Sequence, residues 1–224
     1  MLAGVLADGM AAPLRSPWVV MLVLSVIGLV GVAVTPETAA HRSALTLRPQ
    51  PLRIPAEIRA DFLRAAMAAG AGFAVLGVLT AVSGLFLGTV LHEPGHALAG
   101  GVVFTAVACT ALGQLTVRRF RPATALPTAC AGLIVAAALI ATAMATGTLA
   151  PLLIGAAANG LATGIALGHG IGSIAARSAP EHRGATVSTF FALLYSLLAL
   201  VVLLSLVRTR GPGRPDVSGG DARP

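Results

Sequence analysis

Apolar residues along this chain gather into six long runs, and the segments between the runs hold most of the charges. The runs cover residues 18–34, 62–90, 96–116, 123–146, 149–175 and 185–207. At about 1.5 Å of rise per residue, a helix of about twenty residues crosses a hydrocarbon core roughly 30 Å thick. Lipid offers no partner to backbone amides, so each run predicts a transmembrane α-helix. We therefore expect an all-α membrane protein with about six transmembrane helices.

The composition indicates the same class of protein. Of the 224 residues, 56% are hydrophobic and 10% are charged, whereas soluble domains carry about a quarter charged residues. A single soluble core cannot also bury several apolar runs of this length. The first run is followed by Thr35 and Pro36 without a small-x-small cleavage pattern. We therefore interpret it as a retained span and not as a secretory signal.

Arginines between the runs lie in alternate loops. The chain has no lysine, and its net charge of +7 comes from fifteen arginines set against eight acidic residues. Arginines cluster in residues 35–61 and around Arg118 and Arg177, while the turns near residues 92 and 147 carry none. The arginines of the tail, from Arg208 onward, break this pattern, because six crossings would place them on the opposite side of the membrane. The positive-inside rule places the arginine-bearing loops in the cytoplasm of a protein in the inner or plasma membrane. The pattern indicates topology and contact with the lipid bilayer, not nucleic-acid binding. Gating ion pairs are the alternative role for four loop residues, namely Arg118, Arg119, Arg121 and Arg183.

Glycines recur every four residues in the fifth run, at Gly160, Gly164, Gly168 and Gly172. This spacing places them along one face of a helix, where a second helix can approach closely. Tight helix packing is the prediction, and a smooth face that lets helices slide during transport is the further possibility.

Polar residues inside a membrane span are costly and therefore mark candidate functional positions. The candidates for a substrate pathway are Asn159, Gln114, His169, Thr80 and Tyr195. Local hydrogen bonding is the alternative for Gln114 and His169, which lie toward the cytoplasmic ends of their helices. Asn159 lies deeper, where it predicts either a contact to substrate or a hydrogen bond between helices. No acidic residue falls inside a predicted span, so no proton-coupling carboxylate can be named.

One motif points to a different chemistry. His92, Glu93 and His96 match H-E-x-x-H, in which two histidines one helical turn apart bind zinc and the glutamate activates a water. The sequence also resembles the H-E-x-G-H-A of intramembrane metalloproteases. Pro94 opposes a continuous helix through both histidines, so a turn before the next helix is the favoured interpretation. Cys109 and Cys130 stand alone in apolar runs, and we expect no metal, no cofactor and no enzymatic activity.

Several short motifs resemble the major facilitator superfamily, and in particular its drug-efflux-like bacterial members. Pro36-Glu37-Thr38 resembles the end of that family's sixth helix, and residues 2–7 resemble the end of its fifth. Gly113-Gln114-Leu115, with the arginines that follow, resembles the G-x-L…R-x-x-R-R loop between helices eight and nine, although Val117 stands where an acidic residue is expected. Residues 179–184 resemble the P-x-x-R-G turn before helix eleven.

The resemblance implies helices six to eleven of a twelve-helix transporter. The implied division is residues 1–34 for the end of helix five and helix six, 35–61 for the central loop, 62–207 for helices seven to eleven, and 208–224 for a disordered tail. It implies transport of a small-molecule substrate, with a missing N-terminal half or a second copy as partner. The alternatives are the zinc protease described above and a non-transporting membrane scaffold that assembles through the glycine face.

Overall fold

The fold is almost entirely helical. A computed structural model of the chain describes residues 5, 8–9, 15–36, 59–89, 96–178 and 180–209. Its long helices are α2 (Ser16–Val34), α3 (Arg59–Thr89), α4 (His96–Thr116), α5 (Pro122–Thr146), α6 (Leu149–Arg177) and α7 (Pro180–Thr209), and the short 3-10 helix η2 (Val117–Arg119) follows α4. In this described part of the chain, six helices are long and apolar enough to cross a membrane. The predicted all-α, multi-span fold is confirmed at this level.

Some sequence predictions concern residues outside the described ranges. They are most of the earlier helix expected at residues 2–7, most of the loop at 35–61, and the tail from residue 210. His92 and Glu93 of the possible zinc motif also lie outside the described residues.

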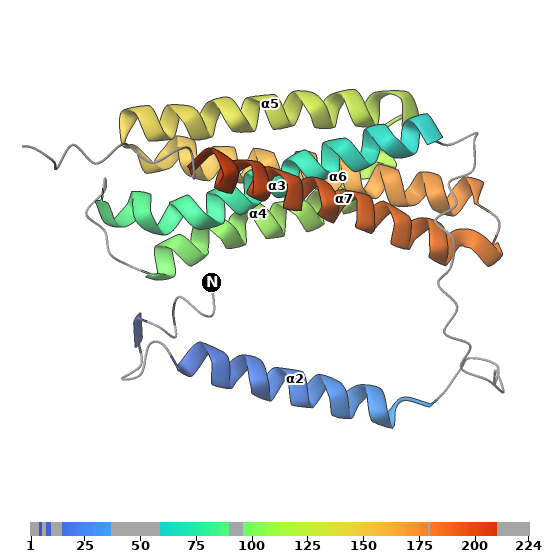
Figure 1. The fold of residues 1–224 in the computed structure, drawn as a ribbon, viewed down its shortest axis with the longest axis horizontal. Coiled ribbons are helices and arrows are strands. Elements are labelled where there is room, and N and C mark those ends of the chain that lie inside the picture. The colour runs from blue at the N-terminus through green and yellow to red at the C-terminus, as the bar shows by residue number, and fades with distance from the viewer. Residues whose placement is uncertain are drawn as a thin grey trace, which may run out of the picture.

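Helices α3 to α7 pack side by side, and consecutive helices run in opposite directions (Figure 1). Helix α6 lies at the centre, where it contacts α3, α4, α5 and α7. Two groups of buried apolar residues fill the bundle. One group, around Phe62 and Phe190, lies toward the start of α3, and the other, around Leu79 and Leu152, lies toward the start of α6.

Glycines allow α6 to approach its neighbours backbone to backbone. A Cβ atom at Gly160 or Gly164 would overlap a backbone carbonyl of α4, at Ala106 or Thr110 respectively. On α3, a Cβ atom at Gly72 would overlap the side chain of Thr163. Small residues serve this purpose in membranes because helix association there depends on close van der Waals packing and not on exclusion of water.

The glycine contact ends before Gly172. A Cβ atom at Gly168 would still meet Val117 at 3.0 Å, but one at Gly172 would meet nothing within 4 Å. The reason is that α4 ends at Thr116 and the chain turns away through η2. The four-residue repeat therefore continues one step beyond the neighbour that it packs against.

Helix ends follow local sequence signals, with one difference from expectation. Helix α5 ends at Thr146, and the next residue, Gly147, has a φ of 64°, a left-handed conformation that favours glycine. Helix α7 begins at Pro180, a residue type that suits the first turn because its missing N–H has no helical partner there. Arg183 therefore lies in the first turn of α7 and not in the loop where the sequence placed it.

Helix α2 lies apart from the other five helices (Figure 1). From Met21 to Val34 all of its residues are exposed, and in its first turns Ser16 is buried while Pro17 and Val20 are partly buried. It is nonetheless parallel to the long direction of the bundle in this view, as a membrane span would be.

Candidate functional site

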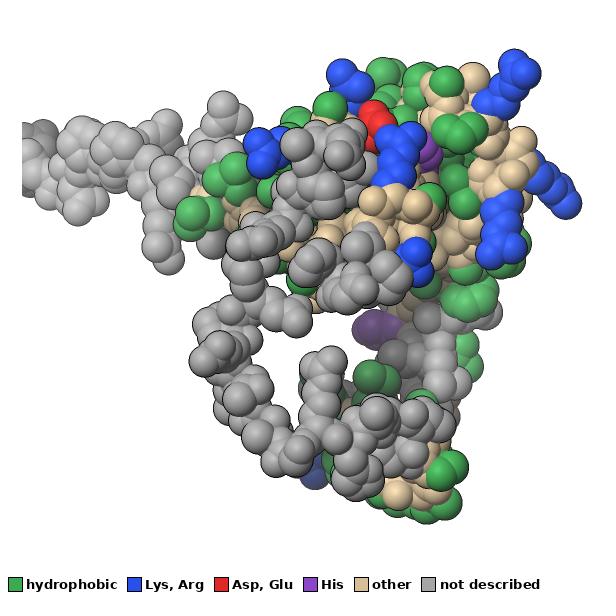
Figure 2. Space-filling model, turned by 90° about the vertical axis from the view of Figure 1, so that its right-hand side faces the viewer, with side chains coloured by type: hydrophobic (Ala, Val, Ile, Leu, Met, Phe, Trp, Pro, Cys, Tyr) green, Lys and Arg blue, Asp and Glu red, His purple; other side chains and the backbone are tan. Residues whose placement is uncertain are grey.

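Most described arginines gather at one end of the bundle. Helices α3, α5 and α7 begin there, and α4 and α6 end there (Figure 1). Figure 2 looks onto this end and shows basic side chains spread over it, with an acidic side chain among them. We call it the arginine end, and the arginines that the helix bounds place there are Arg59, Arg64, Arg118, Arg119, Arg121, Arg177 and Arg183. The positive-inside rule predicts from the sequence that this end faces the cytoplasm, and that orientation stays a prediction.

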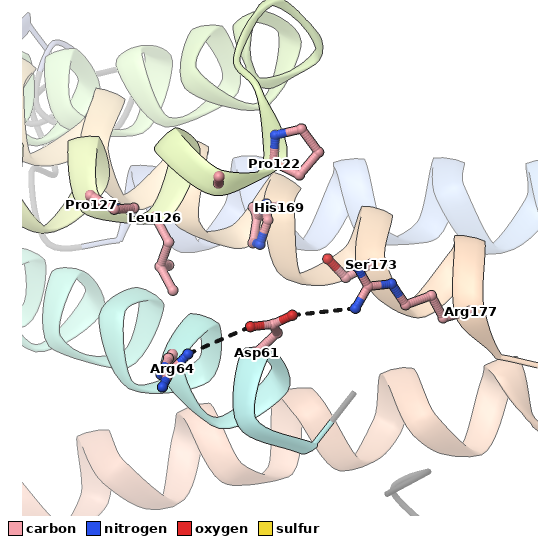
Figure 3. A pocket seen from close by; sticks show the side chains of 9 residues that line it. Asp61, Arg64, Pro122, Leu126, Pro127, His169, Ser173 and Arg177 are labelled. Carbon is pink, nitrogen blue, oxygen red and sulfur yellow. Dashed lines mark hydrogen bonds and ion pairs between the residues drawn. The ribbon is translucent and has the colours of Figure 1, made fainter. Parts of the chain in front are cut away.

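A pocket of about 600 Å³ opens at the arginine end between α3, α5 and α6 (Figure 3). Its polar wall on α6 consists of His169, Ser173 and Arg177. These residues are four apart, which places them on one face of the helix, and we call them the α6 stripe. Helix α3 adds Asp61 and Arg64 from its first two turns. We call this cavity the arginine-end pocket.

The wall contributed by α5 is apolar. It consists of Pro122, Ala123, Leu126 and Pro127, which occupy the first two turns of the helix. Pro127 has no N–H to donate to the carbonyl of Ala123, so that pair lacks the usual helical hydrogen bond. The arginine-end pocket therefore has one apolar side and two polar sides.

Asp61 joins the two arginines of the pocket (Figure 3). Its Oδ2 accepts a hydrogen bond from Nη1 of Arg177 at 3.3 Å, and its Oδ1 lies 3.8 Å from Nη1 of Arg64. The first contact links α3 to α6, and the second lies within α3. All three side chains are partly exposed, with 43% of the Asp61 side chain and 70% of the Arg64 side chain accessible. Exposed pairs of this kind stabilise a fold only weakly, so they can rearrange around a ligand.

A second cavity of about 300 Å³ lies on the other side of the α6 stripe. It shares His169, Ser173 and Arg177 with the first pocket and adds Arg118 from η2. Two of the residues singled out from the sequence, His169 and Arg118, are therefore brought together at the arginine end.

Asn159 lies deep in the bundle, away from the pocket. Its side chain is 1% exposed, and its Nδ2 donates a hydrogen bond to the carbonyl of Gly72 on α3 at 3.2 Å. Its Oδ1 is buried without a hydrogen-bond partner in the structure. Of the two roles that the sequence left open, the structure shows the hydrogen bond between helices.

The remaining candidates do not share a site. The hydroxyl of Thr80 is exposed and donates to the carbonyl of Leu76 in its own helix. Gln114 is exposed on α4, and Tyr195 is exposed on α7, where it stacks on Phe191. The other loop arginines do not line the pocket. Arg119 and Arg121 are exposed, and the Nε of Arg183 donates to the carbonyl of Ser178 at 3.1 Å.

The described part of the possible zinc motif has another partner. His96 is the first residue of α4, and its Nδ1 lies 2.8 Å from Oδ1 of Asp8. The same carboxylate accepts hydrogen bonds from the backbone N–H groups of His96 and Ala97, at 3.2 Å and 2.7 Å. These contacts lower the pKa of Asp8, with the bond from Ala97 as the largest cause. Among the described residues, no group of three or more His, Cys, Asp or Glu side chains could hold a metal ion.

Sequence reasoning missed Asp61, Arg64 and Ser173 as site residues, and treated Arg177 only as a topological charge. The four-residue spacing of the α6 stripe was a usable signal, because it joins a histidine inside a span to an arginine at its end. Asp61 gave no such signal, since 116 residues separate it from Arg177 in the chain.

Comparisons of this chain with protein-family models, with curated proteins and with solved structures found no match.

Proposed function

We propose that this chain is a membrane transporter of the major facilitator superfamily that moves a small molecule out of the cell by a secondary mechanism. The arginine-end pocket is the observation that carries the proposal. A cavity of about 600 Å³ lies in the usual size range of small-molecule sites. It places His169 and Ser173, which are costly in a membrane span, on the wall of a space that a substrate can enter.

The central position of α6 also supports transport. This helix carries the polar stripe at its cytoplasmic end, and it touches α4 through glycines along the middle of its length. A contact without side chains lets one helix shift against another at small cost. In transporters of this kind, two helical bundles rock around a site between them. We propose that a second bundle, from a partner chain or a second copy, completes the path in the plasma membrane.

Inside-out vesicles from a bacterial host that expresses the chain provide the test. The vesicles are energised, and uptake of a panel of radiolabelled organic anions and cations is measured against vesicles without the protein. We expect at least one compound to accumulate above the control. No difference for any compound, with the protein present and monodisperse after extraction, would contradict the transport proposal.

The scaffold alternative makes a separate claim about assembly. Its proposed contact was the glycine face, which is covered by α4 of the same chain at Gly160 and Gly164. Another chain cannot use that surface without displacing α4. The protease alternative would require zinc bound by His92 and His96, with Glu93 activating a water. Stoichiometric zinc in the purified protein, together with proteolysis that is lost in a Glu93→Gln variant, would support it.

A further inference from the structure

We infer that the arginine-end pocket binds a small organic anion, with a carboxylate or phosphate group carried on an apolar body. This inference rests on the proposed transport function and names the substrate class of the same site. Three features of the pocket favour such a ligand, namely the charge balance of its lining, the helix ends that meet there, and the contrast between its walls.

The charge balance of the lining is positive. Arg64 and Arg177 share the carboxylate of Asp61, and no other acidic residue lines the pocket in the part of the chain that the structure describes. One guanidinium charge is therefore left without a countercharge. Guanidinium groups bind carboxylates and phosphates through two parallel hydrogen bonds, and each arginine here uses only one nitrogen for Asp61.

A helix N-terminus adds to the positive potential. Helix α5 begins at Pro122, which lines the pocket. The free N–H groups and the dipole of a helix N-terminus favour anions. The end of α6 has the opposite dipole, but Arg177 lies in its last turn and offsets it.

The walls indicate what carries the anionic group. On the polar side, the α6 stripe offers the hydroxyl of Ser173 and the ring of His169 as further hydrogen-bonding groups beside Arg177. On the opposite side, Pro122, Leu126 and Pro127 of α5 offer only apolar surface. A ligand with a charged head and an apolar body can contact both sides, whereas a fully hydrated inorganic ion cannot use the α5 wall.

The same chemistry occurs in soluble organic anions and in anionic phospholipids. Both carry an acidic oxygen group next to apolar atoms, and both can reach a pocket at the end of a membrane bundle. The binding experiment therefore includes an arm for each source.

The soluble arm measures binding of radiolabelled benzoate to the delipidated full-length protein in a sugar-based detergent, by equilibrium dialysis. We expect saturable binding that the cation benzylamine and neutral benzamide do not displace. The lipid arm uses native mass spectrometry to detect phosphatidylglycerol retained by the protein before delipidation. Retained lipid that blocks benzoate identifies a lipid head group as the occupant, and benzoate binding without retained lipid identifies a soluble anion.

Three variants and one control test the residues. Arg177→Gln and Arg64→Gln should each weaken the anion about tenfold, because each removes one charge-assisted contact. Asp61→Asn should tighten binding, because it removes the carboxylate that competes for both arginines. Arg119→Gln is the matched control, since it removes an exposed arginine at the same end that lines neither cavity, and it should leave affinity unchanged. Arg64 is so exposed that its variant should fold even if that of Arg177 does not.

The outcomes separate this inference from the transport proposal. Preference for benzylamine, or equal weakening by Arg119→Gln, or no anion bound in either arm, would overturn the anion site. Transport of cations alone by the vesicles would support the transport proposal and contradict the anion as its substrate. Anion binding at the pocket without any vesicle transport would support the anion site and contradict the transport proposal.

Discussion

Helices α2 and α6 are both apolar enough to cross a membrane, yet they stand in opposite environments. The most apolar stretch of α2 is 0% buried, whereas that of α6 is 56% buried. Helix α2 is the more apolar of the two, and it presents Leu, Val, Ile and Met on every side. Helix α6 is rich in Gly and Ala and carries Asn159, Thr163 and His169.

The difference teaches that apolar character sets which segments enter the membrane but not which segments pack together. Lipid tails are as apolar as leucine, so large aliphatic side chains gain little by leaving lipid for a neighbouring helix. Small residues gain contact because backbones can meet, and polar residues gain partners that lipid does not provide. The central helix of this bundle is therefore the one with more small and polar residues.

The largest difference in folding stability is expected when a glycine is replaced by leucine in each of the two helices. Gly164→Leu places a side chain against the carbonyl of Thr110 and against the Cα of Gly113, which lies 2.9 Å from the position of the new Cβ. Backbone atoms cannot move aside as a flexible side chain can, so α4 and α6 must separate. We expect a loss of more than about 3 kcal/mol or failure to fold, measured as loss of a monodisperse peak after detergent extraction.

Gly28→Leu in α2 is the matched control, because a Cβ atom at Gly28 would meet nothing within 4 Å. It should extract and elute as the parent protein does. Equal damage from both substitutions would show that α2 packs as tightly as α6, and the comparison would fail.

A smaller effect is expected from removing one large side chain in each helix. Leu152 of α6 is buried beside Leu79 and Val102, so Leu152→Ala leaves a cavity and should cost about 2 to 5 kcal/mol. Leu24 of α2 is exposed, and Leu24→Ala should change stability by less than about 0.5 kcal/mol. Thermal unfolding in detergent measures both. A comparable fall in melting temperature for the two variants would contradict the exposure of α2.

The sequence was sufficient to place the helices because a backbone in lipid has to be helical. The run predicted at residues 96–116 is the same as α4 (His96–Thr116), and the other runs agree within a few residues except at the start of α7. Helix α7 begins at Pro180, earlier than the predicted run, because proline cannot continue a preceding helix but suits a first helical turn.

The arginine-end pocket could not be predicted in the same way. Asp61 and Arg177 lie 116 residues apart in the chain, and only the packing of α3 on α6 brings them together. The glycine repeat predicted that another helix packs closely on α6. Nothing in the repeat shows that this helix, α4, ends before the level of Gly172. Membrane insertion fixes helix positions along the chain, whereas sites depend on the faces that helices turn toward one another.

Removing a polar side chain should also cost more stability in α6 than in α2, but the difference should be smaller than for the apolar side chains. Asn159→Ala removes a buried hydrogen bond to Gly72 and should cost about 0.5 to 1.5 kcal/mol. The cost stays small because the carbonyl of Gly72 keeps its place in α3 and because the unpartnered Oδ1 is removed as well. Ser25→Ala in α2 removes a hydroxyl that is exposed and bonds only to Met21 in its own helix. The change in stability from Ser25→Ala should fall within measurement error. A larger loss than that of Asn159→Ala would show that α2 has a further hydrogen-bond partner.

The smallest effect concerns the contact that links the segment before α2 to the bundle. Asp8 caps the N-terminus of α4 through His96 and Ala97, 88 and 89 residues further along the chain. Its pKa is lowered from 3.8, chiefly by the hydrogen bond from the N–H of Ala97. A lowered pKa in the folded state stabilises that state above the ordinary value, and the contribution is lost as the pH falls through the folded value.

Asp8→Ala should therefore lower the melting temperature slightly at neutral pH, and the difference from the parent protein should shrink as the pH falls below the ordinary carboxyl pKa of 3.8. Asp8→Asn is the control, because its amide oxygen can still accept from a backbone N–H without a titrating charge. That variant should keep most of the neutral-pH stability and lose only the pH dependence. A difference between Asp8→Ala and the parent that stays constant with pH would show that the ionised carboxylate does not stabilise the N-terminus of α4.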